Sequence, residues 1–144
     1  MSGNLGQIRV ALAQINPTVG DLEGNSNLIR EYANKSTEAG AQIVLYPEMV
    51  ITGYPVEDLA LRKTFRRASI NAVSKLAADI AADGNGELLS IVGYLDESED
   101  GKPQNGVALI HRGEVVAKYI KHHLRSEEHT SELQSLRHLV CRLL

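Results

Sequence analysis

The sequence of 144 residues lacks the signals of several common protein classes. Its one cysteine, Cys141, excludes an internal disulfide and a metal site built from cysteine thiolates, and it fits a reducing cytoplasm. No apolar run is long enough to cross a bilayer, and the first fifteen residues lack the basic and apolar regions of a secretory signal. With a net charge of −3, the chain also lacks the basic surplus of a nucleic-acid-binding protein. We therefore expect neither a membrane nor a nucleic acid as partner.

The pattern that is present predicts alternating strands and helices. The composition is 43% hydrophobic and 23% charged, as in ordinary globular domains. We expect strands over 7–15, 41–47, 88–95, 105–111 and 114–120, and helices from 25 or 26 to 39 and over 58–82. Gly40 stands where a left-handed C-cap would end the first helix, and Arg112-Gly113 is typical of a tight hairpin. This order of elements predicts an α/β fold in layers, with a mixed sheet.

The apolar spacing within two of these segments predicts which residues face the core. The strand over 7–15 is β-branched and apolar with little polar interruption, which indicates a buried strand. The second helix has candidate core positions at Leu61, Phe65, Ala68, Ala72, Leu76 and Ile80.

Glu48 is the first candidate for chemistry. It comes directly after a predicted buried strand, in the stretch LYPEMVITGYP (45–55). A carboxylate at a strand end is held at the edge of the sheet, where the active sites of α/β folds gather. Among apolar neighbours such a carboxylate can act as a general base, although a solvated loop glutamate explains the same pattern.

Lys121, at the end of the last predicted strand, is the second candidate. A lysine there can stabilise an oxyanion that forms on a carbonyl group, while a solvated charge is the simpler alternative. Lys118 lies on the same strand, and the alternation of side chains alone does not decide between the two lysines.

The remaining polar and aromatic candidates are weaker. His111, His122 and His123 could suggest a metal, but adjacent residues on a strand point to opposite faces, so no metal site is predicted. Tyr54, in TGYP, is either a packed aromatic residue beside a turn or a contact to substrate.

Two motifs together are more specific than any single residue. VALAQINPTVGDLEGN (10–25), a helix, and IVLYPEMVITGYPVEDL (43–59) resemble the N-terminal glutaminase domain of glutamine-dependent NAD synthetases. That domain belongs to the nitrilase, or carbon–nitrogen hydrolase, superfamily. The resemblance covers residues 8–124, and INPTVGDLEGN and TGYPVEDL are similar to the synthetase branch rather than to free-standing amidases.

The resemblance implies an α-β-β-α sandwich that carries a Glu-Lys-Cys triad. Glu48 would be the general base, and Lys121, which matches the family's K-x-x-L in KHHL, would stabilise the tetrahedral intermediate. Tyr54 would help to shape the glutamine pocket, and Lys118 would only be a neighbour. The fold expected for this chain is an incomplete nitrilase-type sandwich with a mixed sheet.

The family also implies substrates, cofactors and partners. Glutamine would be hydrolysed in this domain without a cofactor. The ammonia would pass to a C-terminal synthetase domain, which uses ATP and Mg to amidate deamido-NAD. The resemblance further implies a homo-oligomer in the cytoplasm.

The composition changes abruptly at residue 125. Residues 125–144 contain no Gly, Ala, Ile, Pro, Lys, Asn or Asp, although all twelve glycines lie upstream. RSEEHTSELQS (125–135) is the in-frame translation of a widely used sequencing adapter, and HLVCRLL (138–144) matches a later adapter segment. We expect 1–124 to be the N-terminal part of a truncated glutaminase domain and 125–144 to be an adapter-derived tail.

If residues 125–144 derive from adapter, the only cysteine, Cys141, has no role in catalysis. Cys141 lacks the flanking residues of the family's nucleophile, so the chain as written is expected to be inactive. Two alternatives stay open. One is a fragment of a free-standing nitrilase-type amidase, and the other is a short non-catalytic binding module whose last twenty residues form a helix packed on the rest.

Overall fold

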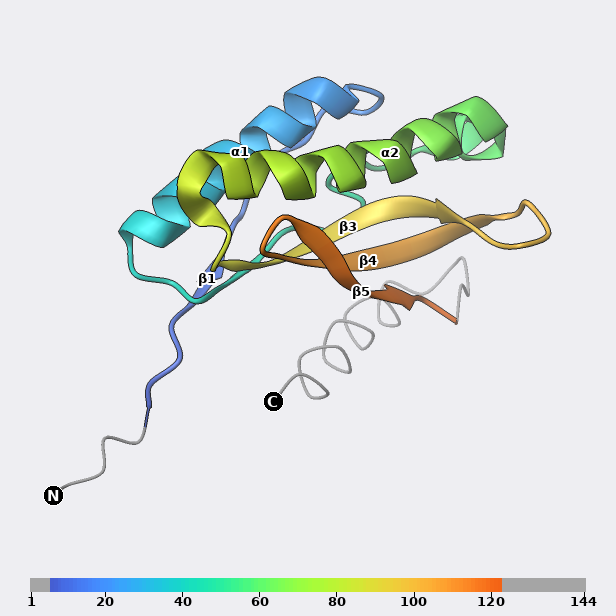
Figure 1. The fold of residues 1–144 in the computed structure, drawn as a ribbon. Coiled ribbons are helices and arrows are strands. Elements are labelled where there is room, and N and C mark those ends of the chain that lie inside the picture. The colour runs from blue at the N-terminus through green and yellow to red at the C-terminus, as the bar shows by residue number, and fades with distance from the viewer. Residues whose placement is uncertain (1–5, 123–144) are drawn as a thin grey trace, which may run out of the picture.

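Two helices lie over one face of a single sheet (Figure 1). The computed structural model describes residues 6–122. Its strands are β1 (Val10–Leu12), β2 (Ile43–Leu45), β3 (Leu89–Glu97), β4 (Pro103–His111) and β5 (Glu114–Ile120). Its helices are α1 (Leu22–Glu38) and α2 (Lys63–Ile80), with short helical turns at Glu57–Leu61 and Ala81–Asn85.

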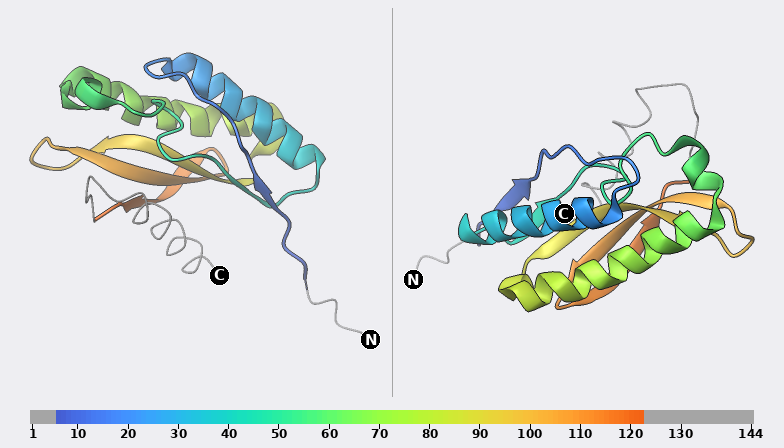
Figure 2. Two further views of the ribbon diagram at one scale, coloured as in Figure 1. Left: turned by 180° about the vertical axis from the view of Figure 1, so that it is seen from behind. Right: turned by 90° about the horizontal axis from the view of Figure 1, so that it is seen from above.

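The sheet is mixed, as the sequence predicts. The strands lie side by side in chain order, with β1, β2 and β3 parallel and β3, β4 and β5 antiparallel. The two parallel connections contain α1 and α2, and both helices return over the same face (Figure 2). The β4–β5 turn is the expected tight hairpin, since Arg112 and Gly113 both have positive φ, at 50° and 80°.

The core fills the space between the helices and the sheet. The fully buried side chains there are mostly branched aliphatic residues, and each contributes about 1.5–3 kcal/mol to folding when it is removed from water. They include Ile29, Val44, Val73, Leu76, Ile80, Val92 and Ile110. This layer holds the sheet rigid, so the residues at its edge have a firm support.

The first helix begins three or four residues earlier than predicted. Its N-cap is Asp21, whose side chain accepts a hydrogen bond of 2.9 Å from the backbone N–H of Gly24. This bond satisfies one of the free donors at the helix start and lets Leu22 and Glu23 join the helix. The predicted end is confirmed, because Gly40 follows α1 with a φ of +74°.

The single long helix predicted over 58–82 is wrong at its start. Arg62 is extended, with φ −82° and ψ 114°, so the short turn ends there and α2 begins at Lys63. Leu61, predicted to be in the core, is 72% exposed, while Phe65, Ala68 and Ala72 are only partly buried. Leu76 and Ile80 are buried as predicted.

A buried charge explains part of this error. The Arg66 guanidinium donates to the Glu97 carboxylate at 2.7 Å and to the carbonyl oxygens of Ala60 and Gly101 at 2.9 and 2.8 Å. A charged residue thus occupies a core-facing position of α2, which a count of apolar residues cannot recognise.

The first strand is shorter and less buried than predicted. β1 has three residues; Ala11 packs on the core, but Leu12 on the opposite face is 69% exposed. The prediction that this first strand is buried is wrong. Within residues 6–122, both helices lie on one side of the sheet and leave Leu12 of β1 exposed on the other. No helix in the same range is long and apolar enough to cross a membrane.

Candidate active site

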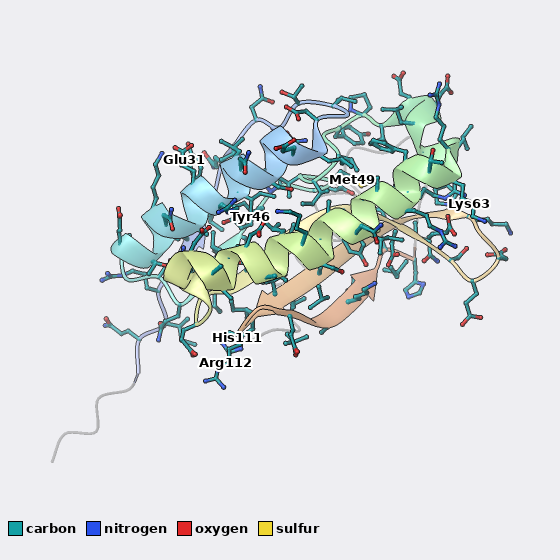
Figure 3. The ribbon with its side chains drawn as sticks, turned by 45° about the horizontal axis from the view of Figure 1, so that its top comes forward. Glu31, Tyr46, Met49, Lys63, His111 and Arg112 are labelled. Carbon is teal, nitrogen blue, oxygen red and sulfur yellow. The ribbon has the colours of Figure 1, made fainter. Side chains whose placement is uncertain are left out.

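Glu48 and Lys121 lie at one end of the sheet, although 73 residues separate them in the chain. β2 and β3 end there, β4 begins there, and β5 returns to it because it pairs antiparallel with β4. The β4–β5 turn, marked by Arg112 in Figure 3, lies at the opposite end. The topology of the sheet therefore brings the two predicted residues to one edge.

The turn that follows β2 holds the backbone of Glu48. Met49 has a φ of 54°, an uncommon value for a residue with a side chain, and its carbonyl oxygen accepts hydrogen bonds from Thr52 and Gly53 at 3.2 and 2.8 Å. The N–H of Ile51 donates to the carbonyl oxygen of Gly93 on β3 at 3.2 Å. The turn is thus closed on itself and fastened to the sheet.

Gly93 on β3 is needed for this close packing. A Cβ atom on Gly93 would lie 2.6 Å from the backbone nitrogen of Met49 and 2.9 Å from the carbonyl oxygen of Pro47. Both contacts are to backbone atoms, so a larger residue would push the turn and Glu48 away from the sheet. No local sequence pattern distinguishes this glycine from the others.

Lys121 contacts Glu48, and Lys118 does not. The Lys121 ammonium donates to Glu48 Oε1 at 3.2 Å. Lys118 lies on the helix-covered face of β5, where its Nζ is 3.8 Å from Asp96 and lies over the ring of Tyr94. Residues three apart on a strand point to opposite faces, and the structure therefore decides a choice that the sequence left open.

Asn105, for which the sequence predicts no role, is the third residue at this edge. Its side-chain amide donates a hydrogen bond to the same Oε1 atom of Glu48. Its carbonyl oxygen accepts a hydrogen bond of 2.9 Å from the backbone N–H of Lys121. Its only sequence signal is its place at the start of a predicted strand.

The three side chains are partly shielded from water. The Lys121 side chain is 13% exposed and the Glu48 side chain is 29% exposed. Partial removal of solvent strengthens the attraction between the opposite charges. Glu48 stays accessible enough to exchange a proton with a molecule that docks at the edge.

The NPTVGDLEGN and TGYP motifs meet through Asn25 of α1. This buried side chain accepts from the Thr18 N–H at 2.8 Å and donates to the carbonyl oxygens of Thr18 and Ile51 at 2.8 and 3.0 Å. The N–H of Gly20 also donates to the carbonyl oxygen of Thr52 at 2.8 Å. The loop before α1 therefore braces the turn that carries Glu48.

The two tyrosines around Glu48 have different surroundings. Tyr46 donates from its hydroxyl to the carbonyl oxygen of Ile29 on α1 at 3.0 Å, and Figure 3 shows it between the two helices. Burial raises the pKa of the Tyr46 phenol, so it stays neutral and acts as an anchor. Tyr54 is 63% exposed on the same connection, where it is free to contact a bound molecule.

Within residues 6–122, no three His, Cys, Asp or Glu side chains lie close enough together to hold a metal ion. His111 lies at the far end of the sheet, 3.8 Å from Glu87, and the Tyr119 and His122 rings meet edge to face. His123 and Cys141 lie outside the described residues.

The arrangement can perform proton transfer beside a polarised carbonyl group. A carboxylate that contacts a lysine at a partly shielded edge can take a proton from a nucleophile, and the ammonium can donate to a developing oxyanion. The described residues, 6–122, contain no cysteine.

The chain is similar to known proteins over most of its length. The carbon–nitrogen hydrolase family matches residues 9–140. A glutamine-dependent NAD(+) synthetase of Rhodobacter capsulatus is 36% identical over 129 residues, which are 89% of this chain and 22% of that protein. The chain thus spans about a fifth of the length of the curated relatives it matches.

Solved structures show the same relationship. A glutamine-dependent NAD(+) synthetase from Cytophaga hutchinsonii is 28% identical with a TM-score of 0.76, over 85% of this chain and 20% of that one. An amidase from Nesterenkonia sp. is 25% identical with a TM-score of 0.67, over 90% of this chain and 49% of that one. A mutant of the AN1 amidase of that genus carries acrylamide at its active site cysteine.

Proposed function

The chain belongs to the carbon–nitrogen hydrolase family, and on this basis we propose that it is the N-terminal part of a glutaminase that supplies ammonia to an NAD synthetase. The contact between Glu48 and Lys121 carries the proposal, because it supplies two of the three groups that such a reaction needs. Similarity to glutamine-dependent NAD(+) synthetases supports glutamine as the substrate. Since the chain spans about a fifth of those relatives, the activity is proposed for the complete protein.

In the proposed reaction Glu48 takes the proton from a cysteine thiol, and the thiolate attacks the side-chain amide carbon of glutamine. Lys121 donates to the oxyanion of the tetrahedral intermediate. The C–N bond then breaks, ammonia leaves with the proton that Glu48 returns, and water hydrolyses the thioester to release glutamate. The acrylamide adduct at the active site cysteine of the related amidase supports thiol chemistry for this fold. Tyr54, exposed beside the turn, is proposed to line the glutamine pocket.

We further propose that the nucleophile belongs to a part of the complete protein outside this sequence. Cys141 is the only cysteine, and its segment, 125–144, is proposed to derive from adapter. The family match runs to residue 140, so the tail needs a test of its own. Genomic DNA beyond the codon of Leu124 is expected to encode a proline and later a cysteine. Independent genomic reads that reproduce RSEEHTSELQS would contradict this part of the proposal.

The proposed partners of the complete protein follow from the ammonia it makes. ATP, Mg and deamido-NAD are assigned to a synthetase domain outside this chain, and the reducing cytoplasm is the proposed location because the nucleophile must remain a free thiol. The glutaminase chemistry of Glu48 and Lys121 requires none of these molecules.

The test uses the complete protein with either glutamine or added ammonia as the nitrogen source. Glu48→Gln removes the proton acceptor but keeps the size of the side chain. We expect glutamine hydrolysis to fall about 10²- to 10⁴-fold, while NAD formation from added ammonia stays at the wild-type rate. Unchanged glutamine hydrolysis in Glu48→Gln would overturn the proposal.

A free-standing amidase is the second candidate, because the amidase from Nesterenkonia sp. matches 90% of this chain. The complete reading frame separates the two candidates. An ATP-binding synthetase domain downstream supports NAD synthesis, whereas a frame that ends after the hydrolase domain supports the amidase. The 144-residue chain alone should hydrolyse no glutamine above background in either case, and robust activity abolished by Cys141→Ala would overturn this expectation.

A further inference from the structure

The two oxygens of the Glu48 carboxylate have different surroundings. Oε1 accepts two hydrogen bonds, one from the Asn105 amide and one from the Lys121 ammonium at 3.2 Å. Oε2 accepts none from any group within residues 6–122. An oxygen that already accepts from two donors is a weaker proton acceptor than its free neighbour, since its lone pairs are occupied.

Asn105 is held more firmly than Lys121 at this oxygen. It lies within β4, and its carbonyl oxygen is joined to the N–H of Lys121 by a bond of 2.9 Å. Its side chain has two rotatable bonds, while the lysine reaches Oε1 through a flexible four-carbon stem. The amide also carries no charge, so its hydrogen bond persists whether or not Glu48 is protonated.

The roles of the two donors therefore differ during the reaction. Lys121 must turn toward the oxyanion of the tetrahedral intermediate, and its contact with Oε1 weakens when it does so. Asn105 has no such second task, and its contact can keep the carboxylate in one orientation throughout. A general base works only when its accepting atom lies within hydrogen-bond reach of the proton it removes.

We propose that Asn105 is a positioning residue that holds Oε1 of Glu48, so that Oε2 is the atom that takes the proton from the nucleophile. The inference rests on the proposed function of Glu48 as general base. The proton moves from sulfur to Oε2 and later from Oε2 to the leaving ammonia, while Oε1 accepts from Asn105 in every state.

The test compares three variants of the complete protein. Asn105→Ala removes the donor, and we expect kcat for glutamine hydrolysis to fall about 10- to 100-fold with little change in KM, because Asn105 acts on Glu48 and not on the substrate. Asn105→Asp has nearly the same shape but places a negative oxygen against Oε1, so its kcat should fall further than that of Asn105→Ala. Gln104→Ala, the neighbour on the helix-covered face of β4, is the matched control and should keep the wild-type kcat.

NAD formation from added ammonia reports the folding of the synthetase domain, and the thermal unfolding midpoint reports the folding of the domain that contains Asn105. We expect both to stay unchanged in all three variants. A wild-type kcat in Asn105→Ala, an equal kcat in Asn105→Ala and Asn105→Asp, or a rise in KM without loss of kcat would overturn the proposal. A clearly lowered thermal unfolding midpoint in both Asn105 variants would also overturn it, by assigning the residue to folding.

Failure of the proposed function is recognised in the wild-type protein. If the complete wild-type protein hydrolyses another amide instead of glutamine, the assignment of glutamine is wrong. The same variants are then compared on that amide, with the thermal unfolding midpoint as the measure of folding. The order of kcat values, from wild type through Asn105→Ala to Asn105→Asp, tests the positioning role equally well there.

Discussion

At the scale of single residues, the alternation of side chains along β5 decides which lysine can reach Glu48. Lys118 and Lys121 differ by three positions and thus lie on opposite faces of the strand. Lys121 contacts the carboxylate, whereas Lys118 lies near Asp96 and Tyr94 on the helix-covered face. Replacing either lysine removes one positive charge from the same region of the sheet. A comparison of the two variants therefore distinguishes the contact of Lys121 with Glu48 from a general effect of lost charge.

We predict that Lys121→Met in the complete protein lowers kcat for glutamine hydrolysis by about 10²- to 10³-fold, because the donor to the oxyanion is lost. Lys118→Met keeps the length and apolar stem of the side chain and should leave kcat nearly unchanged. Steady-state kinetics of the two variants, with the thermal unfolding midpoint as the folding control, measures the difference. Equal losses in both variants would count against a catalytic role for Lys121.

At the scale of elements, one buried amide on α1 couples the two loops that surround the site. Asn25 bonds to Thr18 before α1 and to Ile51 after β2. Close packing of Gly53, whose Cβ would lie 2.6 Å from the backbone nitrogen of Val19, adds to this coupling. The motifs that distinguish the sequence therefore act together as a single brace for Glu48.

Removing this brace should loosen both loops together. Asn25→Ala leaves the buried carbonyl group of Ile51 and the partly buried backbone groups of Thr18 without this partner, and we expect a loss of about 1–3 kcal/mol in the free energy of unfolding. Hydrogen exchange should become faster in 16–21 and 49–53 at the same time. Asn27→Ala, an exposed position on the same helix, is the control and should change neither quantity. Faster exchange in only one of the two loops would contradict the coupling.

A second link joins α1 to the turn that follows α2, and it predicts a dependence on pH. The Arg30 guanidinium donates two hydrogen bonds of 2.7 Å to Asp83, and these bonds hold the pKa of the Asp83 carboxyl below its ordinary value. A lowered pKa in the folded state stabilises the fold above the unfolded pKa of about 3.9, and this contribution is lost as the pH falls through the lower folded value.

The Asp83→Asn variant tests this link. At neutral pH it should be less stable than the wild type by about 1 kcal/mol or less, because the pair is partly solvated. The difference in thermal unfolding midpoint should shrink as the pH falls below about 4 and vanish once Asp83 is protonated in both states. A difference that is constant down to the lowest pH would mean that the charge of Asp83 contributes nothing. Lys75→Ala, which breaks an exposed pair within α2, is a control for general loss of surface charge.

At the scale of the whole molecule, the helices cover only one face of the sheet within residues 6–122 (Figures 1 and 2). Leu12, Val10 and Tyr119 are exposed on strands whose other face is in the core. Apolar sheet faces and open strand edges favour contact between molecules. The site lies at the edge of this sheet. We therefore expect the part of the complete protein that covers the exposed face also to complete the site.

The 144-residue chain expressed alone is expected to self-associate through this face. Light scattering after size exclusion should report species larger than a monomer, and an apolar dye should bind. Leu12→Glu places a charge on the exposed face and should reduce association, whereas Leu61→Glu, equally exposed but away from the sheet, should not. A monodisperse monomer that binds no dye would show that the face is covered.

The elements that the sequence predicted well are those whose signals are local. The β4–β5 turn at Arg112-Gly113 and the end of α1 at Gly40 depend on backbone angles that few residues adopt, and both are confirmed. The family was also recognisable from two motifs, and the comparisons confirm it. The roles of Glu48, Lys121 and Tyr54 stay predictions. The break at Arg62 was missed because an ion pair at Arg66, formed with a distant strand, decides the burial of α2.

The sequence by itself determined the order of the elements and the mixed sheet, since both follow from local patterns, and it predicted Glu48 as the candidate carboxylate. Only the tertiary structure decided that Lys121 and not Lys118 meets Glu48, that Asn105 shares its oxygen, and that Gly93 makes room for its turn. These contacts join β2, β3, β4 and β5 across up to 73 residues of chain. Their physical cause is the register and pleat of the sheet, which no single segment contains.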